Sequence, residues 1–466
     1  MEQLRKTLRD SAAARWTALA VVAFTMLCGY YLTDVMAPLK GLLEGQLHWD
    51  SSEYGFFTSA YGWFNVFLLM LLVGGIILDK MGVRFTGLMA ASIMVVGTAI
   101  KYWAVSTHSL DGQVWHILFW DVKAQVFMAA FGFAIFGVGV EVAGITVSKI
   151  IVKWFKGKEM ALAMGLEMAT ARLGTGLAMA TSVPIAKAFG IVNVSRPILV
   201  CLIMLCIGLM AFIIYTFMDK KLDASEAEAN SATESTNEDE AFRISDIGNI
   251  LTNKGWWYIA ILCVLFYSAV FPFLKYAADL MVNKFGISNE LAGVIPSLLP
   301  LGTIFLTPFF GNLYDRKGKG ATIMLIGAAL IIFVHTMFSI PFLNHWIVAF
   351  LLIIILGIGF SLVPSAMWPS VPKIIPENQL GTAYALIFLV QNVGLMLVPA
   401  LIGWVLDKYC VTGQRVLEGV TINTYNYTLP MIIFTTFGLL AIVFAYLLKA
   451  EDKKKGYGLE LPNIKQ

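Results

Sequence analysis

The chain has 466 residues, of which 58% are hydrophobic and 14% are charged, whereas a soluble domain is roughly 45–50% apolar and about 25% charged. This balance excludes an ordinary soluble domain, and a formal net charge of +3 is too small to indicate binding to nucleic acid. The five cysteines are irregularly spaced and no histidine cluster has metal-ligand spacing, so we expect no disulfide framework, metal or cofactor.

Apolar stretches of membrane-spanning length recur along the whole chain. A span needs about 20 mainly apolar residues, and because lipid offers no hydrogen-bond partners to a backbone, each stretch should be a helix. In chain order the stretches cover residues 16–39, 53–78, 84–105, 124–152, 158–186, 194–217, 255–281, 288–313, 319–340, 345–370, 378–406 and 425–448. The sequence therefore predicts an all-α membrane protein with twelve transmembrane helices.

The loops between these stretches differ in charge from one side to the other. One set is rich in Lys and Arg, for example Lys80, Lys153 and Lys317, and both tails are basic as well. An even number of spans puts the two termini on the same side. The positive-inside rule then predicts that both termini are cytoplasmic.

The composition changes between the sixth and the seventh stretch. Residues 221–240 are rich in Glu, Ser, Thr, Ala and Asn, which is typical of a solvated linker. After them, Ile244, Ile247 and Leu251 recur at helical spacing and indicate a short helix on the cytoplasmic surface. We expect a cytoplasmic N-tail at 1–15, a six-helix bundle at 16–217, an acidic linker with an interfacial helix at 218–254, a second six-helix bundle at 255–448 and a cytoplasmic C-tail at 449–466.

One loop motif occurs twice, after the second and after the eighth stretch. Each copy has a glycine, an aspartate four residues later, a basic residue next, a second glycine and another basic residue within two positions. We expect the first glycine to allow a neighbouring helix to approach, the aspartate to accept hydrogen bonds from amides at a helix start, and the second glycine to permit a tight turn. The copies are Gly75-Ile-Ile-Leu-Asp79-Lys80-Met-Gly82-Val-Arg84 and Gly311-Asn-Leu-Tyr-Asp315-Arg316-Lys317-Gly318-Lys319, 236 residues apart.

Two copies of this motif in equivalent loops of a twelve-span chain resemble the Major Facilitator Superfamily, whose signature loop follows helices two and eight. The resemblance implies two six-helix bundles that rock about a central site, that is, a secondary transporter and not an enzyme. It also implies that the loops stabilise one conformation of the cycle; a purely structural role is the alternative. The residues to which this assigns a gating role are Gly75, Asp79, Arg84, Gly311, Asp315 and Arg316.

Two ionisable residues lie near the predicted middle of the membrane, where a charge costs about 2.5–3.5 kcal/mol on insertion scales. Glu141 should lie about 18 Å from the cytoplasmic end of its helix and Arg172 about 21 Å from the same end of the next helix, at 1.5 Å per residue. In one interpretation the two form a salt bridge inside the first bundle. In the other, both point into a central cavity, where Glu141 binds a cation and Arg172 a carboxylate.

The residues around this pair add a closer resemblance. The turn Trp154-Phe-Lys-Gly-Lys-Glu159, the glycine-rich helix that carries Glu141 and the step Ala171-Arg172-Leu-Gly174 are similar to the superfamily branch that contains the lysosomal dipeptide transporter. That resemblance implies that Glu141 holds the amino group of a peptide and Arg172 its carboxylate. Helix one departs from the branch, because Val35 follows Asp34 where the family tends to place Asn-Pro.

Three further charged residues are candidates for roles in transport. Asp34 and Lys275 should lie at similar depths, about 27 and 28 Å along the equivalent spans one and seven at 1.5 Å per residue. We expect them to meet across the two bundles near the outer face and help to close a gate, although two separately solvated residues are the alternative. Glu167 is a candidate proton site, or it pairs structurally with a base such as Lys149.

Four polar or amphipathic residues stand at depths that suit a cavity: Tyr30, Tyr61, Gln391 and Asn392. Each is a candidate for contact with substrate, and for each the alternative is packing or a hydrogen bond between helices.

The sequence therefore predicts a secondary carrier of dipeptides or similar small zwitterions, working as a monomer in a lipid bilayer without nucleic acid or cofactor. The alternatives are a proton-coupled carrier of small organic anions and, more remotely, a non-transporting receptor on the same fold. Short outer loops favour a bacterial inner membrane, with the lysosomal membrane as the alternative.

Overall fold

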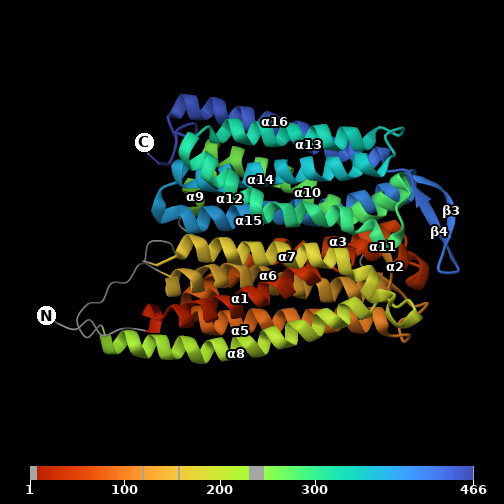
Figure 1. Ribbon diagram of the computed structural model, residues 1–466, viewed down its shortest axis with the longest axis horizontal. Coiled ribbons are helices and arrows are strands. Elements are labelled where there is room, and N and C mark those ends of the chain that lie inside the picture. Colours follow the sequence, from red (N-terminus) through yellow and green to blue (C-terminus); the bar gives the residue numbers. More distant parts are fainter. Residues whose placement is uncertain (1–7, 118–119, 156–157, 230–245, 465–466) are drawn as a thin grey trace.

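The computed structural model of the protein describes residues 8–117, 120–155, 158–229 and 246–464. It is a bundle of long helices that run nearly side by side (Figure 1). Helix α1 begins and helix α16 ends at one end of the bundle, which we call the tail end. Two β-hairpins lie at the opposite end, which we call the hairpin end.

The N-terminal half comprises the helices α1 to α8 and one hairpin. Its elements are α1 (Ala12–Asp34), α2 (Lys40–Leu47), α3 (Ser51–Ser59), η3 (Ala60–Gly62), α4 (Trp63–Phe67), α5 (Met70–Ser106), β1 (Val114–Ile117), β2 (Trp120–Lys123), α6 (Ala124–Phe155), α7 (Met160–Ala186) and α8 (Arg196–Ala229). The strands β1 and β2 pair antiparallel.

The C-terminal half comprises the helices α9 to α16 and a second hairpin, which lies between a different pair of spans from the first. Its elements are α9 (Ile247–Leu251), α10 (Lys254–Phe285), α11 (Asn289–Ala292), α12 (Val294–Lys317), α13 (Gly320–Ser339), α14 (Trp346–Ile374), α15 (Leu380–Tyr409), β3 (Val411–Leu417), β4 (Val420–Tyr425) and α16 (Thr428–Lys455). The antiparallel strands β3 and β4 connect α15 to α16.

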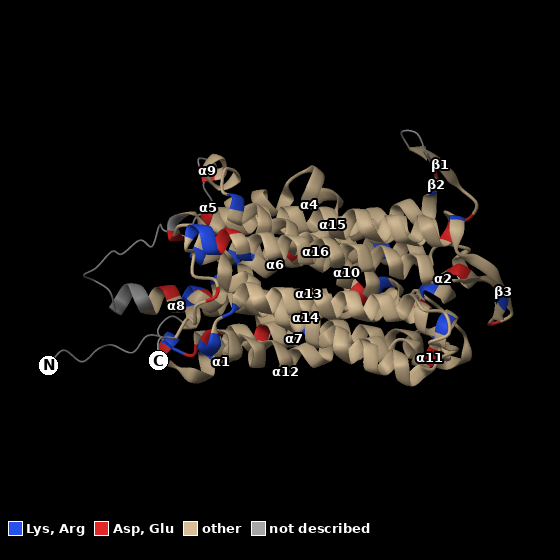
Figure 2. Cartoon of the chain, turned by 90° about the horizontal axis from the view of Figure 1, so that it is seen from above, with Lys and Arg blue, Asp and Glu red and all other residues tan. Residues whose placement is uncertain are grey.

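Ten helices of the described chain are long and apolar enough to cross a membrane. One of them, α5, contains a sharp turn at Gly82 and so belongs to two successive membrane-spanning segments. We call the segment that runs from α3 to Gly82 the second rod. If the two parts of α5 are counted separately and α7 is added, the number of spans rises from ten to twelve, which fits the sequence prediction. Lys, Arg, Asp and Glu gather at the two ends of the bundle and leave its middle mostly apolar, as a membrane-spanning protein requires (Figure 2).

The second rod is interrupted halfway along its length. It runs through α3, η3 and α4, stops at Leu68, and resumes as α5 at Met70. Between them, Leu69 adopts a left-handed conformation with φ of 52°, which is unfavourable for a residue with a Cβ. The interruption lies immediately after Tyr61 and Asn65, two residues that belong to the candidate site below.

The second glycine of each loop motif makes the turn that the sequence predicts. Gly82 has φ of 74° and Gly318 has φ of 68°, a region that glycine enters without steric cost. The expectation for the first glycines is wrong. A Cβ at Gly75 or Gly311 would meet no atom of the described chain within 4 Å, so neither glycine is needed for close helix packing.

The aspartates of the two motifs bind side chains and not the helix-start amides that we expected. Asp79 Oδ1 accepts a hydrogen bond from Lys149 Nζ at 2.7 Å, which ties the second rod to α6. Asp315 Oδ1 accepts from Asn463 Nδ2 at 2.8 Å, in the segment after α16. Arg84 pairs with Asp219 at 3.3 Å and with Asp223 at 2.5 Å on α8.

The region between the halves is described only in part. Helix α8 continues to Ala229, beyond the predicted end of the first bundle, because Ala and Glu favour helices. Residues 230–245, which contain the central part of the predicted linker, lie outside the described residues, as do 1–7 of the N-tail. The short helix α9 contains Ile247 and Leu251, two of the three residues expected on an interfacial helix.

Close packing of α5 on α6 depends on glycines outside the motif. A Cβ at Gly97 would lie 2.4 Å from the Phe136 amide nitrogen and 2.6 Å from the Gly132 carbonyl oxygen. Because these are backbone atoms, they cannot move aside cheaply, and overpacking of this kind costs about 1–3 kcal/mol.

We therefore expect Gly97→Ala to lower the melting temperature of the purified protein in detergent. Gly75→Ala is the matched control, and it should leave the melting temperature unchanged or slightly higher because alanine favours a helix by up to about 1 kcal/mol. Equal destabilisation by the two changes would contradict this account of the packing.

Candidate functional site

Glu141 lies in the interior of the bundle on α6, where its carboxylate faces the second rod. Tyr61 Oη donates a hydrogen bond to Glu141 Oε1 at 2.7 Å. Gly137, one helical turn before Glu141, permits this contact, because a Cβ there would collide with the Tyr61 carbonyl oxygen. Asn392 of α15 approaches the same carboxylate from the C-terminal half.

Arg172 lies on α7 and reaches across to the C-terminal half. Its guanidinium carbon is 5.0 Å from the ring centre of Phe360 on α14 and 5.7 Å from that of Phe271 on α10. Those two rings pack edge to face with centres 5.4 Å apart. A guanidinium on aromatic faces keeps the N–H donors at its edge available to a carboxylate.

The structure does not join Glu141 to Arg172. Within the described residues, no carboxylate lies within ion-pair distance of Arg172, and the polar partners of Glu141 are Tyr61 and Asn392. The first interpretation of the pair, a salt bridge inside the N-terminal bundle, is therefore not what the structure shows. Both charges instead face residues at the junction of the two halves.

The other predicted contact residues divide into two groups. Tyr30 is half-buried and lies in the electrostatic field of Arg172, Glu141 and Glu167. Asn392 accepts a long hydrogen bond of 3.5 Å from Asn65 on the second rod. Gln391 does not join them, because its Oε1 accepts from the buried Cys263 Sγ at 3.5 Å, inside the C-terminal half. The side chains of Gln391 and Asn392 point in different directions because successive positions on a helix are 100° apart.

The suggested pairing of Glu167 with Lys149 is wrong. Lys149 binds Asp79 on α5 instead. Glu167 is half-buried, and its strongest charged neighbour is Arg172. No ion pair of Glu167 is found in the described chain.

Asp34 and Lys275 meet across the two halves, toward the hairpin end. Lys275 Nζ lies 2.6 Å from Asp34 Oδ1 and 2.6 Å from the Thr33 carbonyl oxygen. Both side chains are nearly buried, with 12% and 8% of their surface exposed. Contact of these two residues is what their matched depths on spans one and seven predict.

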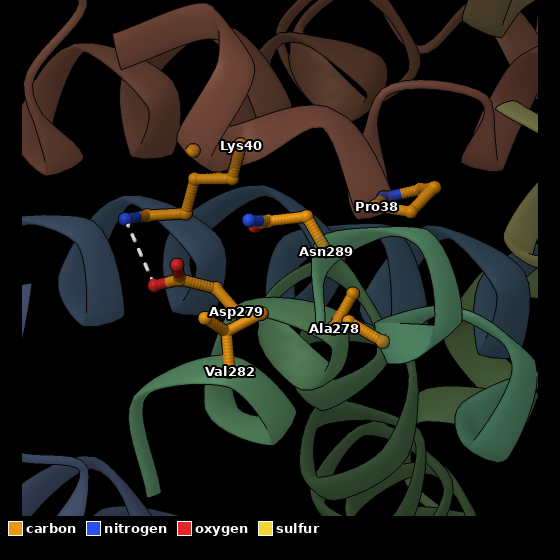
Figure 3. A pocket seen from close by; sticks show the side chains of 8 residues that line it. Pro38, Lys40, Ala278, Asp279, Val282 and Asn289 are labelled. Atoms are coloured by element: carbon orange, nitrogen blue, oxygen red, sulfur yellow. Dashed lines mark hydrogen bonds and ion pairs between the residues drawn. The ribbon is translucent and has the colours of Figure 1, made fainter. Parts of the chain in front are cut away.

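A second ion pair of opposite polarity lies beyond the first, and we did not predict it from the sequence. Lys40 Nζ is 3.1 Å from Asp279 Oδ2, and the two side chains are 2% and 5% exposed (Figure 3). Tyr427 Oη also donates to Asp279 Oδ2 at 2.5 Å. The signal is nevertheless present in the sequence, because Asp34 of span one is followed just beyond that span by Lys40, whereas span seven carries a base and then an acid.

The hairpin β3–β4 belongs to the C-terminal half but rests on α2 of the N-terminal half. Glu44 Oε1 accepts from the Asn423 amide at 2.7 Å, and Glu44 Oε2 accepts from Tyr425 Oη at 3.1 Å. Lys187 at the end of α7 binds Glu418 at the tip of the hairpin at 2.5 Å. These contacts, together with the two buried ion pairs, hold the halves together at the hairpin end.

Comparisons with known proteins identify the family of the chain. The Major Facilitator Superfamily matches residues 14–399. The lysosomal dipeptide transporter MFSD1 of Homo sapiens is 26% identical over 404 residues, which cover 85% of this chain and 81% of that protein. The MFSD1 protein of Danio rerio is 27% identical over 459 residues, which cover 96% of this chain and 89% of that protein.

Solved structures of low sequence identity share the fold. A bacterial homolog of the human lysosomal transporter Spinster, inward-facing and occupied, has a TM-score of 0.70 at 12% identity and covers 95% of this chain and 98% of its own. The xylose transporter XylE from E. coli has a TM-score of 0.65 at 16% identity and covers 93% and 98%. The chain is a multi-pass membrane transporter and belongs to the Major Facilitator Superfamily.

Proposed function

We propose that the protein carries small zwitterions, dipeptides first among them, by alternating access between its two halves. Glu141 receives the substrate ammonium and Arg172 its carboxylate. The observation that supports this most directly is the free edge of the Arg172 guanidinium, which rests on Phe271 and Phe360 of the opposite half with no carboxylate partner in the described chain. The relatives named as dipeptide transporters support the same assignment.

The placement of the two charges suits a short peptide better than a single amino acid. They lie on the antiparallel helices α6 and α7, which contact each other little and both pack against α1. The termini of an extended dipeptide are separated by roughly 7 Å, at about 3.3–3.6 Å per residue. Tyr30 and Tyr61, which flank the charges, can donate hydrogen bonds to the peptide between its termini.

The contacts at the hairpin end and in the motif loops are proposed to control access to this site. In that proposal Asp34–Lys275 and Lys40–Asp279 close the hairpin end. The Asp79–Lys149 and Asp315–Asn463 contacts, together with the ion pair of Arg84 with Asp223 on α8, hold the tail-end loops of each half in one arrangement. Arg316 is assigned to the same loop function.

A proton-coupled carrier of organic anions is the second candidate. It is favoured by Glu167, which is half-buried and has the cation Arg172 as its charged neighbour. In that case Arg172 binds the carboxylate and Glu141 or Glu167 carries the proton, so an amino group on the substrate contributes nothing.

The test is transport by the purified protein in liposomes, measured with a dipeptide and with two derivatives. Under our proposal the N-acetylated and the C-amidated dipeptide both fail to compete, because each lacks one charge that the site recognises. Competition by the N-acetylated form and by simple carboxylates would establish the anion carrier instead. If a dipeptide stabilises the folded protein but is not translocated, the protein is a receptor. Binding alone has this effect, since a ligand at 100 times its Kd raises folding stability by about 2.7 kcal/mol whether or not it is carried.

A further inference from the structure

Lys101 is a buried base for which the proposed transport mechanism has no use. It lies on α5 in the N-terminal half and is 1% exposed. Its Nζ is 4.4 Å from the ring centre of Phe133 and 5.1 Å from that of Phe57. No hydrogen bond or ion pair of its ammonium is found in the described chain. Two aromatic faces therefore hold this cation without a carboxylate.

Three charged or titratable groups act electrostatically on Lys101, and two of them belong to the hairpin-end gate. They are Asp34 on α1, Lys275 on α10 and the thiol of Cys201 on α8. Asp34 is the acid among them, and in the closed arrangement it is occupied by Lys275 at 2.6 Å. Two ammonium groups thus face one carboxylate, and one of them rests on aromatic rings.

The division of these residues between the two halves determines which of them stay together when the gate opens. Asp34 and Lys101 both belong to the N-terminal half, whereas Lys275 belongs to the C-terminal half. If the halves separate at the hairpin end, Lys275 leaves with the C-terminal half, while Asp34 and Lys101 stay together in the N-terminal half. Asp34 has then lost its partner, and a lysine on a flexible four-carbon stem can turn toward it.

We propose that Lys101 is the replacement partner of Asp34 in the conformation that is open at the hairpin end. In the closed conformation Lys275 binds Asp34 while Lys101 rests on Phe57 and Phe133. In the open conformation Lys101 leaves the rings and binds Asp34. Lys101 is thus a positioning residue that stabilises the open state, opposite in effect to Lys275. The proposal rests on the gating role given above to Asp34 and Lys275, and it is independent of the solute.

The experiment measures opening directly, without a substrate. Ala278 is 2% exposed and lines the pocket beside Lys40 and Asp279, so a cysteine there is reachable only when the halves part (Figure 3). The variant Ala278→Cys is made in a background whose five native cysteines are alanine. The protein is placed in nanodiscs, and the rate of its labelling by a charged maleimide reports the open fraction.

We expect Lys275→Met to raise the labelling rate and Lys101→Met to lower it at least tenfold. Lys101→Arg should stay within threefold of the parent, because it keeps a cation in reach of Asp34. When Asp34 is changed to Asn, Lys101→Met should alter the rate less than twofold, because no charge then needs a partner. If Lys275→Met does not raise the labelling rate, the gating role of Asp34 and Lys275 is wrong. If Lys101→Met does not lower the rate, the exchange of partners is wrong.

Two outcomes would overturn the proposal. One is an unchanged labelling rate in Lys101→Met, and the other is an equal decrease with Asp34 and with Asn at that position, which would mark a structural role. If Lys101→Met does not fold, Phe133→Leu supplies the second arm. Removal of a ring that favours the closed conformation should raise the labelling rate about twofold or more, since a cation–π contact contributes about 0.5–2 kcal/mol; no increase would contradict the proposal.

Discussion

Arg172→Ala is expected to reduce dipeptide transport more than a hundredfold, the largest effect of any single change at the site. Truncation of one partner in a buried, hydrogen-bonded charge pair typically costs about 2–5 kcal/mol or more, and about 2.7 kcal/mol corresponds to a hundredfold change in affinity. Arg172→Lys should be intermediate, because lysine keeps the charge but loses the planar fork that binds a carboxylate through two hydrogen bonds.

The measurement is uptake of a labelled dipeptide into proteoliposomes, with exposed Lys220→Ala as the control for general effects of losing a cation. Derivatives then identify which end of the substrate each charge binds. The preference for a free C-terminus over its amide should disappear in Arg172→Ala, and the preference for a free amine over its N-acetyl form should disappear in Glu141→Gln. If either variant keeps both preferences, the assignment of the two residues is wrong.

Lys40→Met is expected to shift the protein toward the conformation that is open at the hairpin end. Breaking a buried ion pair by removing one partner costs about 3–5 kcal/mol, and about 3 kcal/mol is more than a hundredfold in the ratio of closed to open. The effect should lie at the lower end of this range, because Asp279 keeps its hydrogen bonds from Tyr427 and Asn283.

The measurement is the distance between spin labels at Ser106 and Phe342, which are exposed at the hairpin end of opposite halves. Longer distances should dominate in Lys40→Met and in Asp279→Asn. The exchanged pair Lys40→Asp with Asp279→Lys provides the matched control, since it keeps both charges and should recover the closed distance. Recovery would show that the charges, and not the size of the side chains, hold this end together.

The sequence is most informative where membrane insertion constrains it. Charges are costly in lipid, so Glu141 and Arg172 are identifiable as candidates, and their helix spacing predicts that they lie at one level. The contact of Asp34 with Lys275 comes from the same argument about depth. Spacing does not reveal orientation within a helix of nearly uniform polarity, which is why Gln391 and Asn392 are grouped in the sequence although only Asn392 reaches the interface.

Other features depend on contacts between distant segments. The rings of Phe271 and Phe360 beneath Arg172 lie among many phenylalanines, and nothing local distinguishes them from packing residues. The role expected of Gly75 is wrong because a glycine in a motif can also face open space. The hairpin β3–β4 lies where the sequence predicts only a short outer loop, although its strands reach α2 of the other half.

The interruption of the second rod at Leu69 bears on what fills the middle of the bundle. Where a helix stops and restarts, several amides and carbonyls lose their partners in the chain, and hydrocarbon cannot replace them. Phe67, Leu68 and Leu69 are 70%, 58% and 42% exposed at this point. Acyl chains would leave those backbone groups unsolvated, so we expect this surface to adjoin a hydrated vestibule that opens toward the tail end. Solute would then approach Glu141 through water along this interrupted rod, with a few hydrogen-bonding groups of the main chain lining its way.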